Sequence, residues 1–360
     1  MRECSACKVC FPDDVETCER DGAPTKPTLA IDQLVNERYR LVKRLGRGSI
    51  SVVYRAIDEH SGTECALKII LPEYTGNNAA AGNSFLSHAA DAFALRHPHI
   101  AAVTDAGMID ESFPFIVTDL ITGPSLEKVL SRSGALSPSS AFEYLNAIGE
   151  GLSYAHSKGI VHGDLKPRNI LLADERLGSE AIRTTDFGLA AIKAGKLQGA
   201  AQEASGVLRS PLYLAPEEWS EEQSDARSDI YSLGVVLYHM LTGAPPFSGK
   251  SNAAIMKSHL KDPPPSFAGR FAGLTVEIEQ VVLHALEKEP AKRPASVAEF
   301  ADEFSAALTS ASAEYEAFGV KEDIAVESRW ATIQPILLAV GVILVITLIG
   351  IGVYYSRMSQ

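Results

Sequence analysis

The order of hydrophobic and polar positions divides the chain into a strand-rich part and a later helix-rich part. Residues 39–70 and 103–117 alternate between apolar and polar side chains, which predicts β-strands. Residues 84–95 between them predict a single helix, and after residue 125 helices take over. Ser137, followed by proline, predicts a capped helix start that leads into 141–157. The pattern predicts an α+β protein with a small sheet-rich lobe and a larger helical lobe.

A different apolar pattern occupies the C-terminal part of the chain. Residues 336–353 carry no charge, and the run continues into Tyr354 and Tyr355. About twenty apolar residues cross a bilayer of roughly 30 Å, and Trp330 and the two tyrosines suit the aromatic belts at its two interfaces. A buried globular helix would show a polar face, and none interrupts this run. We therefore predict a transmembrane helix over 332–355.

Length and composition agree with this division. The chain has 360 residues, of which 46% are hydrophobic, so it exceeds the usual size of a single domain and can build two cores. Residues 306–331 contain Ser, Ala, Glu and Asp but few large apolar side chains, which predicts a juxtamembrane linker or a loose helix. The net charge of −12 argues against nucleic acid or an anionic lipid surface as a partner.

Candidate catalytic residues lie in the segment 160–172, which reads IVHGDLKPRNILL. It contains Asp164, Lys166 and Asn169, and Asp186-Phe187-Gly188 follows it. These side chains supply a carboxylate near a nucleophile, a cation for phosphate oxygens and two oxygen ligands for magnesium. They are the minimum set for moving a phosphoryl group from ATP.

A glycine-rich segment precedes this set, within the predicted strands. A lone pair of glycines is weak evidence, because most such pairs only form turns. Here Lys68 follows in another predicted strand, and the two features together are specific. The residues expected to cover the ATP phosphates are Leu45, Gly46, Arg47, Gly48, Ser49, Ile50, Ser51, Val52 and Val53.

In this order the motifs resemble the eukaryotic-type protein kinase family, in its bacterial Hanks-type serine/threonine branch, over residues 39–305. The resemblance implies a two-lobed fold with an antiparallel-sheet N-lobe, a helical C-lobe and ATP in the cleft between them. It also implies one position for each catalytic group. Lys68 orients the α and β phosphates, and Lys166 neutralises charge on the transferred group. Asn169 and Asp186 hold Mg²⁺ or Mn²⁺, and Asp164 accepts the hydroxyl proton.

The same resemblance implies the adenine site and the substrate class. Thr118 is placed as the gatekeeper, and the residues from Asp119 to Ile121 offer backbone groups to adenine. Lys166, two residues after the catalytic aspartate, is typical of the serine/threonine branch, and Ser210 lies where that branch places a hydroxyl residue. Protein substrates that carry serine or threonine are therefore expected.

Three further charged residues match architectural positions of the family. Glu217 ends the activation segment and Arg293 is its expected buried partner. Removal of one member of such a pair costs roughly 3 to 5 kcal/mol, because the other charge is stranded. Asp229 matches the acid that holds the backbone of the catalytic loop from below.

Two positions depart from the family pattern. His88 stands where the family has the glutamate that pairs with Lys68, and histidine cannot replace an anion. Asp91 lies three residues later on the same helical face, and we hypothesise that its carboxylate reaches Lys68 instead. Gly163 replaces the arginine that reads a phosphate on the activation segment, so regulation is expected to take another route.

A separate unit of residues 1–27 precedes the kinase-like part. Its cysteines and one aspartate have the spacing of a zinc ribbon, and so short a segment cannot bury a core without a metal. A redox thiol cluster and disulfides are the competing interpretations, and lasting disulfides are disfavoured in the cytoplasm. The candidate zinc ligands are Cys4, Cys7 and Cys18, with either Cys10 or Asp21 as the fourth.

The predicted location follows from the ATP requirement, since Arg329 and Arg357 lie on opposite sides of the span and give no orientation. Residues 1–329 are expected in the cytoplasm, the helix in the plasma (inner) membrane, and 356–360 beyond the lipid bilayer. Self-association as a homodimer stays open, because the glycines of the helix lack the usual contact spacing. Two functions remain: an active membrane-anchored kinase, or a pseudokinase that serves as a nucleotide-binding scaffold.

Overall fold

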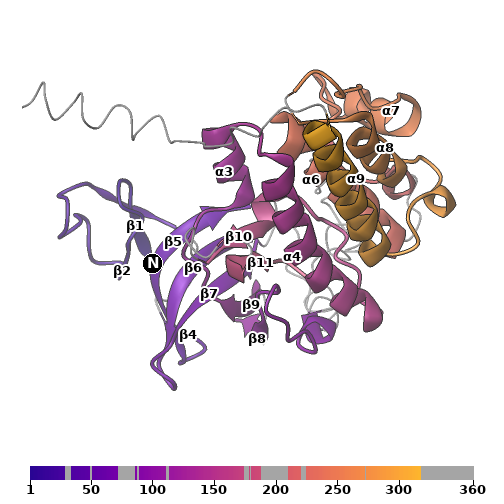
Figure 1. Cartoon of the computed structure of the whole chain (residues 1–360). Coiled ribbons are helices and arrows are strands. Elements are labelled where there is room, and N and C mark those ends of the chain that lie inside the picture. Colours follow the sequence, from indigo (N-terminus) through magenta and orange to yellow (C-terminus); the bar gives the residue numbers. More distant parts are fainter. Residues whose placement is uncertain are drawn as a thin grey trace, which may run out of the picture. The chain divides into compact units, whose positions relative to one another are not determined.

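The alternating segments form a six-stranded antiparallel sheet with the order β4-β5-β6-β7-β9-β8. Its strands lie to the lower left of helices α4, α6, α8 and α9 in Figure 1. Side chains of adjacent residues point to opposite faces of a strand, so Lys68 lies on one face while Leu67 and Ile69 lie on the other. The strands are β4 (Leu34–Val35), β5 (Tyr39–Arg47), β6 (Ser51–Asp58), β7 (Glu64–Ile70), β8 (Val103–Ile109) and β9 (Phe113–Asp119).

The computed structural model forms two units, Met1–Ala311 and Ser312–Gln360. It describes residues 1–28, 34–48, 51–71, 86, 89–110, 113–173, 178, 180–187, 210–219, 224–271 and 273–317, with side chains in the last range to 311. Several predicted features lie outside the described residues, namely Ser49, Ile50, His88, Gly188 and the segment 332–355. Among the described residues, no helix has the length and apolar content needed to cross a membrane.

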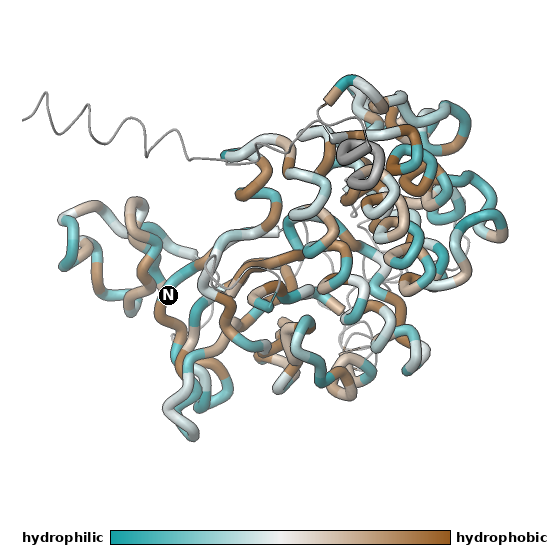
Figure 2. Tube along the Cα trace, viewed as in Figure 1, coloured by the Kyte–Doolittle hydropathy of each residue, from teal (hydrophilic) through white to brown (hydrophobic). Residues whose placement is uncertain are grey.

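The sheet has two buried faces. The face that carries Leu67 and Ile69 forms one hydrophobic cluster, which also includes Tyr54 and Phe115. The opposite face contributes Ile116 to a second cluster that continues into the helical lobe. Figure 2 shows these hydrophobic segments in brown, with teal hydrophilic segments at many outer turns. The second cluster contains residues of both the sheet and the helices, so it fixes this face of the sheet relative to the helical lobe.

The helical lobe is built around α6. This helix is capped by Asp225, ends at Gly243 in the left-handed conformation, and is buried on nearly all sides. It packs closely on α8, since a Cβ atom on Gly234 would lie 2.9 Å from the Cβ of Ala285. The long helices are α3 (Leu126–Ser133), α4 (Pro138–Ser157), α6 (Ala226–Thr242), α7 (Asn252–Lys261), α8 (Val276–Ala285) and α9 (Val297–Ala317).

Short strands and 3₁₀ helices lie between the longer elements of the helical lobe. The catalytic segment ends in β10, and the segment before Asp186 forms β11, which pairs antiparallel with it. The predicted cap is confirmed, because the Ser137 side chain accepts the Ser140 N–H and proline begins α4. The short elements are β10 (Ile170–Leu172), β11 (Ile182–Thr184), η1 (Pro167–Asn169), η4 (Pro211–Tyr213), η5 (Pro216–Trp219) and η6 (Pro290–Lys292).

Regular structure continues beyond both predicted boundaries of the kinase-like part. Helix α9 runs to Ala317 and therefore passes the predicted start of the linker at residue 306. At the other end, the cysteine unit forms a small antiparallel sheet with the order β2-β1-β3, from β1 (Arg2–Cys4), β2 (Cys10–Phe11) and β3 (Thr25–Pro27). This unit lies beside β5 in Figure 1.

Candidate active site

The predicted catalytic side chains converge at the end of the catalytic loop. Asp164 is buried, and the Nζ atom of Lys166 lies 2.7 Å from its Oδ2 atom. Asn169 donates its side-chain N–H to the carbonyl of Asp164 at 2.9 Å, which leaves its amide oxygen as the atom that suits a cation. Residues 164–169, which end in the turn η1, thus hold a carboxylate, an ammonium and an amide oxygen close to one another.

Asp229, at the start of α6, holds this loop from below. Its two carboxylate oxygens accept the backbone N–H groups of His162 and Gly163, each at 2.8 Å, and His156 Nε2 lies 2.7 Å from Oδ2. Burial would raise the pKa of Asp229, but these contacts outweigh it, and the pKa lies below its ordinary value. The prediction that this residue supports the loop backbone is confirmed by these bonds.

His162 connects the catalytic loop to the Asp186 segment. It is fully buried, its Nε2 atom lies 2.9 Å from the Thr185 carbonyl, and its Nδ1 atom accepts the Asp164 N–H at 3.2 Å. Burial lowers its pKa, so the ring is neutral and carries its proton on Nε2. Its ring also packs against the ring of Phe187 in a T-shaped arrangement, with the two ring centroids 4.7 Å apart. The sequence did not predict this link, because a histidine does not by itself indicate which backbone groups its ring will contact.

Lys68 comes from the sheet and Asp186 from the loop after β11, and the structure joins them in an ion pair. Asp186 has a φ of 73°, the left-handed region that a non-glycine residue rarely occupies. Such strain persists only where the surroundings enforce it, and it is concentrated at functional sites. The predicted phosphate-binding lysine and the predicted metal ligand are therefore held at the same point of the cleft.

The hypothesised contact between Lys68 and Asp91 is not what the structure shows. Asp91 is exposed to solvent, and Lys68 contacts Asp186 from the other lobe. A helical side chain that points outward cannot reach a strand on the inner face of the sheet. His88, the other helical residue of interest, lies outside the described residues.

Gly163, which stands where the family has an arginine, has a positive φ of 66°. Glycine occupies this region without the steric cost that a side chain brings. Its N–H points down to Asp229 Oδ1 at 2.8 Å, so the unusual conformation presents two successive N–H groups to one carboxylate. The loop geometry is thus kept although the arginine is absent.

The glycine-rich segment spans the turn between β5 and β6. Gly46 and Arg47 pair with Val53 and Val52, and Gly48 donates its N–H to the Ser51 carbonyl at 2.8 Å. Across the sheet Val53 pairs with Lys68, so the end of this turn lies next to the lysine. The described members of the segment thus lie close to Lys68, and their contact with the ATP phosphates stays a prediction.

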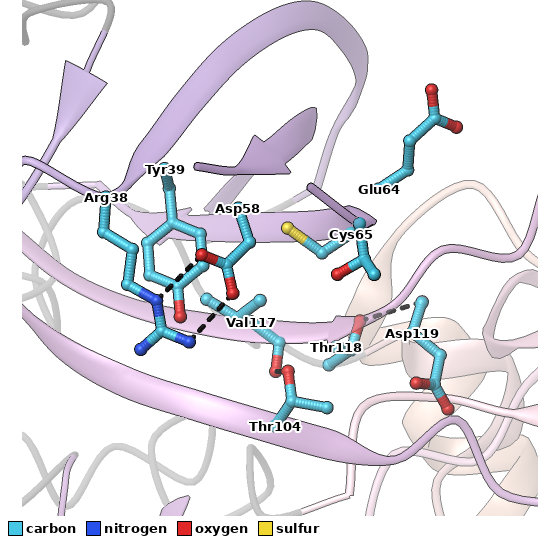
Figure 3. A pocket seen from close by; sticks show the side chains of 10 residues that line it. Arg38, Tyr39, Asp58, Glu64, Cys65, Thr104, Val117, Thr118 and Asp119 are labelled. Carbon is cyan, nitrogen blue, oxygen red and sulfur yellow. Dashed lines mark hydrogen bonds and ion pairs between the residues drawn. The ribbon is translucent and has the colours of Figure 1, made fainter. Parts of the chain in front are cut away.

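The predicted adenine-binding residues lie at the end of β9. Asp119 is exposed, its N–H donates to the Ala102 carbonyl at 3.1 Å, and Ile121 is half-buried beyond it. Thr118 and Asp119 border a cavity of about 310 Å³, and Figure 3 shows the side chains that line it. Its other walls include Cys65, which belongs to the hydrophobic cluster on the far face of the sheet. The cavity therefore opens away from the residues that carry the phosphate chemistry.

Glu217 and Arg293 form the predicted buried pair. The two guanidinium nitrogens of Arg293 lie 2.7 and 2.8 Å from the two carboxylate oxygens, and both residues are buried. Ser228 donates its hydroxyl to the same carboxylate at 2.7 Å. Burial would raise the pKa of Glu217, but the bonds from Arg293 outweigh it and lower the pKa. The pair ties the end of the activation segment to the helical lobe.

The N-terminal unit gathers four ligand atoms. Those of Cys4, Cys7, Cys18 and Asp21 all lie within 4.8 Å of one another. Two thiolates on one tetrahedral zinc ion, at about 2.3 Å each, lie roughly 3.8 Å apart, and the Cys7 and Cys18 sulfurs are 3.8 Å apart. Cys4 Sγ lies 3.4 Å from Asp21 Oδ1. The residues fit a small tetrahedral cation.

Protonation differs among the four candidate ligands. The Val9 N–H would lower the pKa of Cys7, but burial and the neighbouring Cys4, Asp21 and Cys18 raise it to about 11. Burial would raise the pKa of Cys4, but the N–H groups of Cys7 and Ala6 point at its sulfur and lower the pKa overall. The Ala23 N–H lowers the pKa of Asp21. Cys10, the other candidate for the fourth position, does not share the group. It is buried in the hydrophobic cluster on the far face of the sheet, and burial raises its pKa to about 12.

Comparisons with known proteins agree with this geometry. Residues 39–304 match the protein kinase domain family, and the chain belongs to this family. It is 34% identical to serine/threonine-protein kinase PknB of Mycobacterium tuberculosis over 268 residues, which cover 74% of this chain and 42% of that protein. It is 31% identical over 279 residues to serine/threonine-protein kinase pkn3 of Myxococcus xanthus, covering 77% of this chain and 51% of that one.

Solved structures give the same result. The crystal structure of the Mycobacterium tuberculosis PknI kinase domain superimposes with a TM-score of 0.61 at 26% identity, covering 78% of this chain and all of that one. The two-lobed kinase fold predicted from the sequence is therefore confirmed. The chain spans less than half the length of PknB, so the shared part is the kinase domain.

Proposed function

We propose that this chain transfers the terminal phosphate of ATP to serine or threonine hydroxyls of protein substrates. The observation that carries the proposal is the convergence of Asp164, Lys166, Asn169 and the Lys68–Asp186 pair in one cleft. The matching relatives are serine/threonine-protein kinases. A scaffold that only bound nucleotide would have no need for a buried carboxylate beside the lysine of the catalytic loop.

The residues of the cleft have separate tasks. Asp164, held by the loop and by its contact with Lys166, accepts the proton of the substrate hydroxyl. Lys68 draws the α and β phosphates toward the cleft, and Lys166 balances negative charge on the group in transfer. Asn169 and Asp186 offer the oxygen atoms that magnesium or manganese prefers. When bound, that ion neutralises charge on the phosphate oxygens.

The test compares the full chain with Asp164→Asn in the transfer of radioactive phosphate from ATP to a serine- and threonine-containing protein. Loss of a positioned general base lowers the rate by about 10² to 10⁴. Asp302→Asn is the matched control, because that carboxylate is exposed on α9 and lies outside the catalytic loop. Equal incorporation by the chain and by Asp164→Asn, with ATP still bound, would instead identify a pseudokinase.

We propose a second function for the N-terminal unit, structural zinc binding through Cys4, Cys7, Cys18 and Asp21. The mutual distances of the four ligand atoms support it. The test is metal analysis of the purified chain together with titration of its accessible thiols. One zinc per chain, lost in Cys18→Ser and retained in Cys65→Ser, is the expected result, because Cys65 lies in the sheet.

We also propose that residues 332–355 anchor the kinase in a membrane, with the catalytic part on the cytoplasmic side. The uncharged run 336–353 supports this. The chain should then stay in the membrane fraction after an alkaline carbonate wash and require detergent for release. Substitution of Val342 and Leu344 by arginine should move it to the soluble fraction. Release of the unchanged chain by carbonate would contradict the proposal.

A further inference from the structure

The N-terminal unit closes an open edge of the kinase sheet. Strand β4 covers β5 only at Tyr39 and Arg40. Further along, Val9 forms an antiparallel bridge with Lys43, and the Arg44 N–H donates to the Lys8 carbonyl at 2.9 Å. An edge strand left uncovered has unpaired N–H and C=O groups. The unit therefore continues the sheet on the side of β5 that leads into the glycine-rich turn.

A partly buried ion pair strengthens this contact. Glu3 Oε2 lies 2.7 Å from Arg44 Nε, and the Glu3 side chain is only 9% exposed. Met1 and Cys10 add apolar contact, since both belong to the hydrophobic cluster on the far face of the sheet. Arg44 is thus held by a side chain and a backbone carbonyl of the N-terminal unit, and the segment Leu45–Val53 begins at the next residue.

The two residues that hold Arg44 are neighbours of metal ligands. Glu3 precedes Cys4, and Lys8 follows Cys7. The turn that joins these cysteines closes with the Lys8 N–H on the Cys4 carbonyl at 3.2 Å, and Lys8 has a φ of 64°. A cation held by both thiolates would fix this turn, because it would link its two ends. The positions of Glu3 and Lys8 then depend on the metal.

The strand on the receiving side needs such support. The pairing of β5 with β6 shifts register between Leu41 and Lys43 and again between Arg44 and Gly46. Irregularities of this kind bend a strand and re-aim its side chains. They lie on both sides of the two residues that the N-terminal unit contacts. The direction in which β5 enters the glycine-rich turn therefore depends on contacts at both of its edges, with β6 on one side and the N-terminal unit on the other.

We propose that the metal-loaded N-terminal unit is a clamp on β5 that positions the glycine-rich segment for the ATP phosphates, with Arg44 as the positioning residue. This rests on the proposed kinase and zinc functions. Metal binding and ATP binding are then coupled, and the coupling is reciprocal, so ATP tightens zinc by the factor by which zinc tightens ATP. Couplings of this type are typically about 5- to 150-fold.

The experiment uses the full chain in detergent, with reducing agent present, either loaded with zinc or stripped by a chelator. Initial rates over a range of ATP concentrations give kcat and KM separately. We expect removal of zinc to raise the KM for ATP about 5-fold or more and to change kcat less, because Asp164 and its neighbours stay in place. Adding zinc back restores the KM.

Two variants test the route through Arg44. Arg44→Gln and Glu3→Gln should each raise the KM for ATP in the zinc-loaded chain, and zinc removal should then add little. Arg40→Gln is the matched control, because Arg40 lies on the same strand but pairs with exposed Glu59. It should keep the full response to zinc. Thermal unfolding checks that each variant is folded, and two separate variants guard against the failure of one.

The outcomes separate the three proposals. The clamp would be overturned if the KM for ATP were the same with and without zinc. The other two proposals would still stand if that chain held one zinc ion and lost its activity in Asp164→Asn. A folded chain without bound zinc overturns the zinc site and the clamp together. Equal loss of zinc response in Arg40→Gln and Arg44→Gln would also overturn the clamp, because the effect would then not pass through Glu3.

Discussion

The catalytic cleft and the N-terminal cysteine unit both collect polar side chains, but different forces hold them. In the cleft, Asp164 and Asp186 are supported by Asp229, by buried His162 and by two hydrophobic clusters. In the cysteine unit, four candidate ligands are spaced within residues 4–21, in a segment too short to bury a core of its own. The cleft is therefore preorganised by the fold.

The difference concerns what must be present for each site to exist. A buried carboxylate such as Asp229 is satisfied by backbone N–H groups from its own chain, so the catalytic loop has its shape before ATP arrives. Thiolates such as Cys4 and Cys7 repel one another once deprotonated, and only a cation makes their proximity favourable. The first region should tolerate metal removal, and the second should not.

The largest expected effect is on the scaffold of the cleft. Arg293→Ala strands the buried Glu217 carboxylate and should lower the free energy of unfolding by roughly 3 to 5 kcal/mol. Denaturant unfolding of the full chain measures this. Arg40→Ala removes an exposed pair with Glu59 and should cost about 0 to 1 kcal/mol. Similar losses in both variants would mean that burial does not distinguish the two pairs.

The next effect is on catalysis. Lys68→Ala removes the cation that meets Asp186 and should lower kcat/KM by about 10² to 10³, the scale for one electrostatic contact to the transition state. Steady-state assays at saturating magnesium measure it. Lys257→Ala is a suitable control, because Lys257 is exposed on α7, away from the sheet. A loss below about threefold in Lys68→Ala would show that the lysine is not used.

Metal removal should separate the two regions directly. A chelator should expose Cys4, Cys7 and Cys18 to a thiol reagent, while Cys65 stays protected in the sheet. The main unfolding transition of the kinase part should shift by only a few degrees, because its two hydrophobic clusters do not need the ion. Loss of the whole cooperative transition on chelation would make the cysteine unit a part of the kinase core.

A pH titration should affect the cleft scaffold at acid pH. The pKa of Glu217 lies below its ordinary value of 4.5 in the folded chain. A depressed pKa stabilises the fold above that ordinary value, and the contribution is lost as the pH falls through the folded pKa. Stability should therefore decline from about pH 4.5 downward, and less steeply in Glu217→Gln. Equal slopes in both chains would exclude this carboxylate as the cause.

The smallest effect is expected at the position where the sequence and the structure disagree. Asp91→Ala should change phosphate transfer by less than about twofold, because the side chain is exposed and Lys68 contacts Asp186. The same kinetic assay measures it beside Lys68→Ala. A loss comparable to that of Lys68→Ala would restore the helix aspartate as the partner of the lysine.

Much of the kinase part was predictable from the sequence. Strand alternation, the Ser137 cap and the order of motifs from Leu45 to Asp186 report local geometry, and a short window of residues contains that information. The Glu217–Arg293 pair was predictable only through family resemblance, because the two residues lie far apart in the chain. The link from His162 to the Thr185 carbonyl had no signal, since a backbone acceptor has no residue type.

The sequence by itself determined the classes of residue available to each site: the acids, amide and lysines of the cleft, and three of the four ligands of the cysteine unit. Only the tertiary structure decided which partners meet. It paired Lys68 with Asp186, chose Asp21 over Cys10 beside the thiols, and placed the N-terminal unit on β5. The physical reason is that such choices depend on the packing of whole elements, which fixes distances between residues that no local pattern connects.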